Sequence, residues 1–539
     1  MDELPKQKRS FFRRELVYLA VVLIAATIVG ILAVLRLNTT TTTTQGSDYL
    51  ENLPKDEVTV GVLQQISGLY PKTPFDVDSL AINSNIFEGL TQIRNGRVGP
   101  ALAEGWTNPD NLTWRIKLRN GVKFHNGEAL NASDVKYSIE QAKNNQDWVS
   151  NSLASRIDSV SVVDDSTVEL KTAKPEPTLL HWLVFLCILS EDQVKKDGLD
   201  KAVGTGPYKL VSIDEKQITL EANNAYWGGA PKVKKLVYKA FDDNKALAEG
   251  LENGEADTAL LFEETYNSSL ENKGFRVVQA RIDEVSFLGF DTSSKKAKHV
   301  DAETNPFANF DVRKAIFLAI DVKKLLKATG VKGEPLTQFG TPALVGYNPN
   351  IKRADADIQE AKELLEKAGY SNGFKVTLDL NDSSKKFGEE IKKQLFQINI
   401  EVELNPYSDF QGFIERLTID SSFYVGVYGP DTLDSIDLLN SFFHTPDEEG
   451  NGFNNFGLFS NEKIDKLLDQ ASATFNTNER SKLTQTIQAE VMKQLPVVPL
   501  YTRVGNFAIR DDVAFKPAPF GFIFGVEISG RQKATNTQQ

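Results

Sequence analysis

Strand-like and helix-like patterns alternate along the chain from about residue 58 onward. Short apolar or alternating runs are typical of strands, and apolar residues three or four positions apart are typical of amphipathic helices. In the first half, these patterns predict strands at residues 58–63, 208–213, 218–222, 233–241 and 256–261, and helices at residues 133–143 and 245–251.

Two hairpins are predicted in the region between the first and second of these strands. The alternating stretch 112–118 leads to Asn120-Gly121, a dipeptide typical of hairpin turns. Residues 160–171 alternate in the same way around a polar centre. We therefore expect residues 86–190 to form a compact α+β unit.

The second half of the chain predicts a parallel sheet. Residues 375–380 and 400–404 have strand patterns, and residues 387–395 between them have helical spacing. A strand, a helix and a strand in this order form a βαβ unit, whose strands are parallel. We expect the aromatic and β-branched run Phe423–Tyr428 to join this sheet.

Extended apolar segments at residues 285–290 and 497–501 bracket this second region, which also has helical patterns at residues 464–475 and 483–495. A lobe that is entered and left through adjacent extended segments can close on its neighbour by hinge bending. The expected fold class is therefore α/β, with two lobes and an α+β insertion in the first lobe.

The length and composition are consistent with this organisation. A chain of 539 residues exceeds a single hydrophobic core, so two or three folded units are expected. The formal net charge of -12 argues against a nucleic-acid partner. The single cysteine, Cys187, excludes a disulfide within the chain, and its apolar neighbours predict a buried, unreactive thiol.

The N-terminus predicts attachment to a membrane. A basic segment precedes an uninterrupted apolar run from Leu16 to Leu35, which is long enough to cross a bilayer as a helix. The positive charges place the N-terminus in the cytoplasm and the bulk of the chain outside it. A cleaved signal peptide is the alternative, but it would need a shorter apolar core and a small-residue cleavage site. The run is long and ends at Leu35-Arg36-Leu37, which favours an uncleaved single-pass anchor in the cytoplasmic membrane.

Candidate chemistry gathers at the end of the predicted strand Phe423–Tyr428. The strand breaks at Gly429-Pro430, and a carboxylate, Asp431, follows directly. In open α/β sheets, ligands bind beyond the carboxyl ends of the strands, so Asp431 is a candidate ligand-binding residue. Asp434 and Asp437 come next, and we interpret both as helix-capping residues.

Several sequence blocks, in fixed order, resemble family 5 extracellular solute-binding proteins, the dipeptide- and oligopeptide-binding receptors of ABC importers. They are NIFEGLTQ at residues 85–92, VGTGPYKL at 203–210, YWGGAP at 226–231, FLGFDT at 287–292 and FDVRKAIFLAID at 310–321. The resemblance extends from about residue 58 to 517 and implies a two-lobed, type II periplasmic-binding-protein-like fold with an extra subdomain.

The resemblance and the anchor together imply a complete domain plan. We expect a cytoplasmic segment (1–15), a transmembrane anchor (16–37), a Thr-rich linker (38–55), lobe I (56–85, 191–284 and 501–530), its α+β subdomain (86–190), lobe II (285–500) and a disordered tail (531–539). The binding region would lie in the periplasm or on the cell surface. Family members are usually lipid-anchored or free, so an uncleaved anchor departs from the family pattern.

The resemblance also implies roles for individual residues. In the family, a Trp-x-x-Asp pattern after a strand supplies the aspartate that binds the α-amino group of an extended peptide. The matching residues here are Tyr428, Gly429 and Asp431, with tyrosine in place of tryptophan.

A second part of the implied site comes from lobe I. The family uses backbone groups just before a Leu-Asp-Pro-like triplet, which Leu69-Tyr70-Pro71 matches loosely. Ser67, Gly68 and Leu69 are therefore candidates. The resemblance also places Tyr501 near the cleft.

The resemblance implies a short, extended peptide as ligand, and the permease and ATPase subunits of an importer as partners of a monomeric receptor. No cofactor or metal is expected, because the four histidines are far apart and lack metal-ligand spacing. An enzymatic activity is not expected either, because the chain has no Walker-type loop and no Gly-x-Ser-x-Gly elbow. The alternatives are a receptor for a nickel chelate or an oligosaccharide, and a surface sensor or adhesion module without a transport role.

Overall fold

The computed structural model describes residues 49–63, 66, 68–72, 77–94, 96–199, 201–430, 432–518 and 521–533. The expected anchor from Leu16 to Leu35 and two candidate site residues, Ser67 and Asp431, lie outside these ranges. Within them, no helix combines the length and the apolar character needed to cross a membrane.

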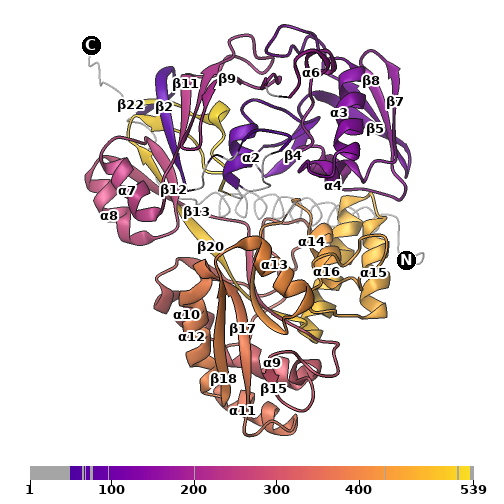
Figure 1. The fold of residues 1–539 in the computed structure, drawn as a ribbon, viewed down its shortest axis with the longest axis vertical. Helices are drawn as coiled ribbons and strands as arrows, with labels where there is room; N and C mark the ends of the chain where they lie inside the picture. Colours follow the sequence, from indigo (N-terminus) through magenta and orange to yellow (C-terminus); the bar gives the residue numbers. More distant parts are fainter. Residues whose placement is uncertain are drawn as a thin grey trace, which may run out of the picture. The chain divides into compact units, whose positions relative to one another are not determined.

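Lobe I is built from the elements that precede residue 282 and those that follow residue 504 (Figure 1). Its strands are β2 (Lys55–Val62), β3 (Thr91–Arg94), β4 (Arg97–Pro100), β5 (Ala103–Asp110), β6 (Thr113–Leu118), β7 (Ser159–Asp164), β8 (Thr167–Lys171), β9 (Tyr208–Ile213), β10 (Gln217–Ala222), β11 (Val233–Ala240), β12 (Thr258–Leu261), β13 (Phe275–Arg281) and β21 (Val513–Ala514). Its helices are α2 (Val77–Asn83), α3 (Ala132–Asn144), α4 (Asn151–Ala154), α5 (Leu179–Trp182), α6 (Glu191–Asp197), α7 (Asn244–Glu252) and α8 (Asn267–Asn272), with short 3₁₀ turns at Glu264–Tyr266 and Gly525–Glu527. Strands β1 (Tyr49–Leu53) and β22 (Ser529–Lys533) lie at the two ends of the described chain.

Lobe II is built from the intervening elements. Its strands are β14 (Val285–Phe290), β15 (Val300–Asp301), β16 (Gly333–Pro335), β17 (Phe374–Asn381), β18 (Ile400–Tyr407) and β19 (Phe423–Tyr428). Its helices are α9 (Phe310–Ala319), α10 (Val322–Thr329), α11 (Ile358–Lys367), α12 (Lys385–Phe396), α13 (Phe410–Ile419), α14 (Ser435–Phe443), α15 (Glu462–Ser472) and α16 (Thr477–Gln494), with 3₁₀ turns at Pro306–Ala308 and Asp382–Ser384.

One strand connects the two lobes. β20 (Val497–Arg510) pairs with β14 and β16 through its first half and with β12 and β13 through its second half. Figure 1 shows it running from the orange elements of lobe II to the magenta and purple elements of lobe I. The sequence pattern predicted only a short extended segment here, which is wrong because hydrogen-bonding partners from both lobes extend the strand past polar residues.

The expected α+β subdomain is an antiparallel sheet in the order β5-β6-β8-β7, with α3 packed against it. The hairpin at residues 160–171 is confirmed by the pairing of β7 with β8. The predicted hairpin at Asn120-Gly121 is wrong: the dipeptide follows the end of β6, and the described strand that comes next in the chain, β7, does not pair with β6. β6 instead pairs with β5, which precedes it, and with β8.

The expected parallel sheet of lobe II is confirmed. β17 pairs in parallel with β18 and with β19, and β14 joins β19 antiparallel. Phe423 and Val425 contribute to the core on one face of the sheet, which also contains residues of α9, α11 and α12, and Tyr424 contributes to the core of α13, α14 and α16 on the other. Burial on both faces explains the near-continuous apolar run in this strand.

The single thiol is buried in lobe I, as predicted. Cys187 is 7% exposed, and burial raises the pKa of its thiol to about 12. A thiol with so high a pKa carries almost no thiolate near neutral pH and is unreactive.

Candidate ligand-binding site

The carboxyl ends of three parallel strands meet at one edge of the lobe II sheet. β17 and β18 end as a pair at Asn381 and Tyr407, and β19 ends at Tyr428. Ligands of open α/β sheets bind beyond such an edge. Val427 is 47% exposed here, although it belongs to a largely buried strand, and sequence reasoning did not select it.

The predicted lobe II residues converge on the first residues of β14. Tyr428 is the register partner of Val285, and Tyr501 is the register partner of Ser286 from the opposite side. Tyr428 and Tyr501 therefore lie on the two strands that flank β14, although 73 positions of sequence separate them. Gly429, directly after β19, is exposed.

The two tyrosines differ in their environment. Tyr428 is half-buried, and its ring meets that of Phe442 edge-on at a centroid distance of 4.9 Å. Tyr501 is only 4% exposed and stacks on Phe387 at 5.0 Å, so its ring belongs to the lobe II core in this conformation. Burial raises the pKa of the Tyr501 hydroxyl, which is therefore neutral at physiological pH.

Tyr70 fixes the lobe I loop that contains Gly68 and Leu69. Its backbone N–H donates to Asn83 Oδ1 at 2.7 Å, and its hydroxyl bonds to Ser150 Oγ at 3.0 Å. Leu69 packs against the lobe I core, and Gly68 has a φ of 132°. That backbone conformation is favourable only for glycine, so the shape of this loop depends on Gly68.

The lobes are connected by β20 and by the chain between β13 and β14. The backbone N–H of Ile282 donates to the Arg503 carbonyl at 2.9 Å, and Thr502 Oγ1 donates to the Ile282 carbonyl at 2.7 Å. Arg503 also forms a two-pronged ion pair with Glu284, with Nη2 to Oε2 at 2.7 Å. Nothing in the local sequence pattern indicated these hinge contacts, because their partners are more than 200 positions apart.

A second contact between the lobes lies at the start of α14. Thr178 of lobe I donates its hydroxyl to Asp437 Oδ1 at 3.1 Å, and Thr432 donates to Oδ2 at 2.6 Å. The interpretation of Asp437 as a capping residue is therefore wrong, because its carboxylate binds two hydroxyl groups. For Asp434 capping is confirmed: its Oδ1 accepts from the backbone N–H of Ile436 at 3.1 Å.

Asp434 has a second function in the packing of lobe II. Its Oδ2 pairs with Arg480 at 2.8 Å, with the two side chains 1% and 4% exposed. Burial raises the pKa of the Asp434 carboxyl, and the Arg480 charge opposes that rise. This ion pair joins the N-cap residue of α14 to α16.

The lobe I side of the contact is also charged. Burial raises the pKa of Glu176, and the Asp437 carboxylate adds to this rise. The Arg156 guanidinium, 3.3 Å from the Glu176 carboxylate, opposes it. Burial lowers the pKa of His181, opposed by the carboxylates of Asp437 and Asp434. The contact therefore places acidic groups from both lobes close together.

Thr178→Val is expected to weaken the interlobe contact by about 1 kcal/mol, because it removes the hydroxyl that joins the lobes. Pairs of spin labels, one on each lobe, should then report a population of longer distances. Thr113→Val is the matched control, since it also removes a Thr–Asp bond, at 3.1 Å to Asp110, but within lobe I. Unchanged distances in the Thr178 variant would show that this bond does not hold the lobes together.

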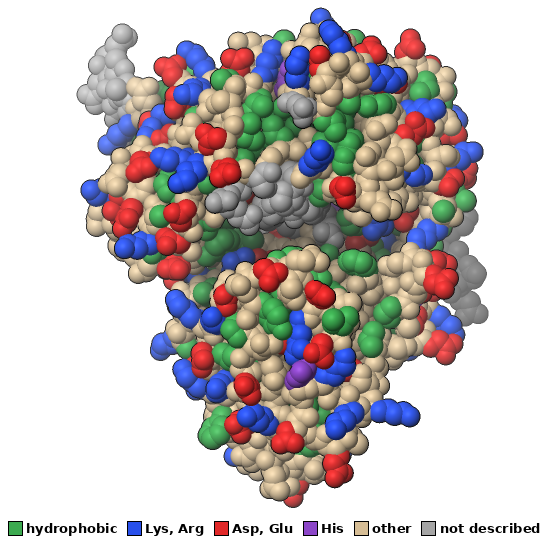
Figure 2. Space-filling view, viewed as in Figure 1, with side chains coloured by type: hydrophobic (Ala, Val, Ile, Leu, Met, Phe, Trp, Pro, Cys, Tyr) green, Lys and Arg blue, Asp and Glu red, His purple; other side chains and the backbone are tan. Residues whose placement is uncertain are grey.

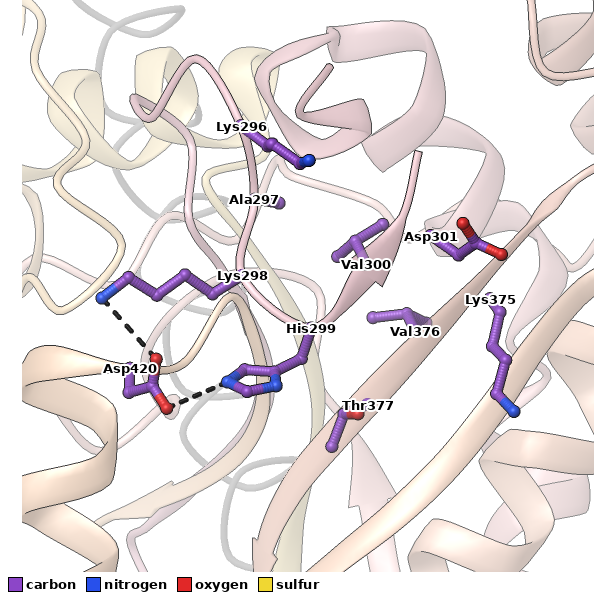
Figure 3. A pocket seen from close by; sticks show the side chains of 10 residues that line it. All are labelled: Lys296, Ala297, Lys298, His299, Val300, Asp301, Lys375, Val376, Thr377 and Asp420. Carbon is purple, nitrogen blue, oxygen red and sulfur yellow. Dashed lines mark hydrogen bonds and ion pairs between the residues drawn. The ribbon is translucent and has the colours of Figure 1, made fainter. Parts of the chain in front are cut away.

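A hollow of about 690 Å³ on lobe II lies apart from the predicted site residues (Figure 3). Its wall includes Lys296 and Lys375. It also includes Asp420, whose carboxylate lies 2.9 Å from His299 Nε2 and 3.7 Å from Lys298 Nζ. Asp420 is therefore paired with Lys298, and Lys375 lies 3.6 Å from Glu403. None of the five predicted ligand-binding residues within the described ranges lines this pocket.

Within the described ranges, no group of three His, Cys, Asp or Glu side chains is arranged to hold a metal ion. His125 has a structural position: Nε2 lies 3.0 Å from the Gly206 carbonyl, and Nδ1 accepts from the backbone N–H of Gly204 at 3.3 Å.

Comparison with known proteins agrees with this architecture. The chain is 27% identical over 474 residues to the glutathione-binding protein GsiB of Salmonella choleraesuis, covering 83% of this chain and 89% of the relative. It is 27% identical over 510 residues to heme-binding protein A of Haemophilus influenzae, covering 84% and 88%. The ABC transporter-associated periplasmic binding protein DppA of Helicobacter pylori, solved with the peptide STSA, superposes with a TM-score of 0.75 at 25% identity, covering 89% of this chain and 98% of that one.

The sequence model for bacterial extracellular solute-binding proteins, family 5, matches residues 97–450, about two thirds of the chain. The blocks that suggested this resemblance fall on the elements that build both lobes, and the fold agrees with that of the solved relatives. This chain belongs to family 5 of the bacterial extracellular solute-binding proteins.

Proposed function

We propose that the protein is the extracytoplasmic receptor of an ABC importer and captures short, extended peptides between its lobes. Asp431 binds the α-amino group of the peptide through a charge-assisted hydrogen bond. Tyr428, Gly429 and Tyr501 form the lobe II side of the site, and Ser67, Gly68 and Leu69 offer backbone groups from lobe I.

The observation that carries this proposal is the course of the chain on either side of Asp431. Gly429 continues from the carboxyl edge of the lobe II sheet, and Thr432 bonds to the carboxylate that reaches lobe I. The segment between them connects the sheet edge to the interlobe contact. A carboxylate on such a segment is suited to bind a ligand that both lobes enclose.

The peptide class is supported by the relatives. The Helicobacter pylori DppA was solved with a peptide, and glutathione, which GsiB is named for binding, is itself a tripeptide with a free amino group. On the face shown in Figure 2, the described acidic and basic side chains are interspersed and no broad basic area is present. This mixed surface charge and the net charge of -12 both argue against a nucleic acid as the ligand.

The proposed receptor is a monomer that delivers its ligand to a separate permease and ATPase. The apolar run from Leu16 to Leu35 attaches it to the cytoplasmic membrane, with the lobes outside. A tether of this kind keeps the receptor close to the permease without a lipid group.

Native mass spectrometry of the full chain, purified in mild detergent, tests the proposal. Co-purified short peptides released on denaturation are the expected result. Recovery of heme, a metal chelate or an oligosaccharide in their place would reject the peptide class. Titration with synthetic peptides of two to nine residues then gives the preferred length.

Gly68→Ala is expected to weaken peptide binding about fivefold. Alanine at this φ strains the backbone by about 1–3 kcal/mol, and the loop relieves the strain by moving the groups that face the ligand. The new Cβ adds no steric clash, because nothing lies within 4 Å of it, so the loss of protein stability should not exceed this strain. Isothermal titration calorimetry with a tetrapeptide measures the effect. Gly105→Ala is the control, since its Cβ is equally unobstructed but its φ is not positive; equal affinities of the two variants would exclude the loop from the site.

A further inference from the structure

Lobe I contains a cavity of about 110 Å³, and none of the proposed peptide-binding residues that the structure describes lines it. Its wall comes from α2, from the β3 strand, from the chain after α5 and from residues 522–527 near the C-terminus. All of these elements belong to lobe I, so the cavity does not depend on closure of the two lobes.

The deep wall of the cavity is effectively apolar. Its side chains include Phe87, Phe185 and Phe524, and its polar groups already have partners within the protein. Glu88 illustrates this: its carboxylate accepts from the Tyr226 hydroxyl at 2.7 Å, from Trp227 Nε1 at 3.0 Å and from Thr205 Oγ1 at 2.8 Å.

Two hydroxyl groups of the wall also have partners within the protein. Thr91 Oγ1 donates to the Leu180 carbonyl at 2.6 Å, and Ser84 Oγ donates to the Ala81 carbonyl at 2.7 Å. Polar groups that already have partners hold water less well, which favours an apolar occupant in this part of the cavity.

The size of the cavity limits the occupant. An engineered apolar cavity of about 150 Å³ binds benzene. At about 110 Å³, this cavity fits a branched aliphatic group better than an aromatic ring.

Two charges stand at the exposed side of the cavity. Arg94 and Glu527 both line the cavity and are exposed, and neither side chain forms a hydrogen bond or ion pair with another residue that the structure describes. They are nonetheless close enough to interact: desolvation raises the pKa of Glu527, and the Arg94 and Lys516 charges oppose that rise. The mouth therefore offers one positive and one negative group that remain available to a ligand.

We propose that this cavity binds a free α-amino acid with a branched aliphatic side chain of about leucine size. The side chain fills the apolar cavity, the carboxylate faces Arg94 and the ammonium group faces Glu527. This pairing satisfies both charges and leaves no polar ligand atom in the apolar interior. The site is separate from the peptide site and does not depend on the proposed function.

Calorimetric titration of the full chain with L-leucine tests the proposal. Two analogues each lack one charge: 4-methylpentanoate has no ammonium group, and 3-methylbutylamine has no carboxylate. Binding of L-leucine, with both analogues about tenfold weaker or worse, is the expected result. The absence of L-leucine binding, or equal binding of the three compounds, would overturn the proposal.

Charge variants assign the site. Arg94→Gln and Glu527→Gln should each weaken L-leucine binding about tenfold, and Val526→Phe, which enlarges a wall residue, should reduce it further. The matched controls, Arg97→Gln and Glu104→Gln, change exposed charges on β4 and β5 that do not line the cavity. Unchanged binding in both charge variants would overturn the assignment.

The peptide site provides an independent check. L-Leucine binding should be unaffected by Asp431→Asn, and peptide binding should be unaffected by Arg94→Gln. If a peptide displaces L-leucine competitively, the amino acid occupies the interlobe site and the lobe I assignment is wrong. If L-leucine binds as described but no peptide binds, only the proposed peptide function fails.

Discussion

Arg480→Leu is expected to destabilise the protein by about 3–5 kcal/mol, because it leaves the buried Asp434 carboxylate without its partner. The two side chains are 4% and 1% exposed, so water cannot replace the lost ion pair. Arg480 also donates to the Thr474 carbonyl at 2.7 Å, and this bond is lost with it. Urea denaturation followed by tryptophan fluorescence measures the free energy of unfolding.

Two comparisons isolate the effect of the buried charge. Lys463→Leu also breaks a Lys/Arg–carboxylate pair, with Glu490 at 2.7 Å, but at the surface, where the expected cost is about 0–1 kcal/mol. Asp434→Ser combined with Arg480→Leu removes both charges while serine can still cap α14, so it should recover part of the lost stability. If Arg480→Leu alone costs no more than Lys463→Leu, the pair does not stabilise lobe II.

Asp431→Asn is expected to lower peptide affinity by about 2–5 kcal/mol, a loss of at least about thirtyfold, because the ammonium group of the bound peptide loses its charged partner. Calorimetric titration with a tetrapeptide measures the loss. Asp355→Asn, which changes an exposed loop carboxylate of lobe II, should leave the affinity unchanged.

A chemical change in the ligand tests the same contact from the other side. N-acetylation removes the positive charge of the peptide, so the acetylated peptide should bind wild-type protein weakly and should lose little further affinity in the Asp431→Asn variant. Additive losses from the two changes would show that Asp431 does not bind the amino group.

The β19 strand shows what a local sequence pattern can predict. Its predicted bounds, Phe423–Tyr428, are those of the structure, because a run buried on both faces carries a strong and local signal. The β17–α12–β18 unit was predictable for the same reason. The turn at Asn120-Gly121 was predicted as a hairpin, but a turn signal does not identify which strand pairs with the one before it. β6 pairs with β5 and β8 instead.

The candidate site was partly predictable. The family resemblance implied Tyr428, Gly429 and Tyr501, and the structure brings Tyr428 and Tyr501 to the same end of β14. Asp437 was assigned to capping because Asp is common at helix caps, yet its carboxylate contacts Thr178 of the other lobe, 259 positions away. No local pattern can reveal such a pair, since neither residue has an unusual neighbourhood in the sequence.

The sequence by itself determined the strands, the helices, the acidic balance of the chain and the resemblance to its family, because each depends on residues that are close together along the chain. Only the tertiary structure decided that β20 joins both lobes, that Arg503 and Glu284 pair at the hinge, that Thr178 meets Asp437 and that lobe I encloses an apolar cavity flanked by Arg94 and Glu527. These features depend on contacts between distant segments, which form only when burial of the separate cores brings those segments together.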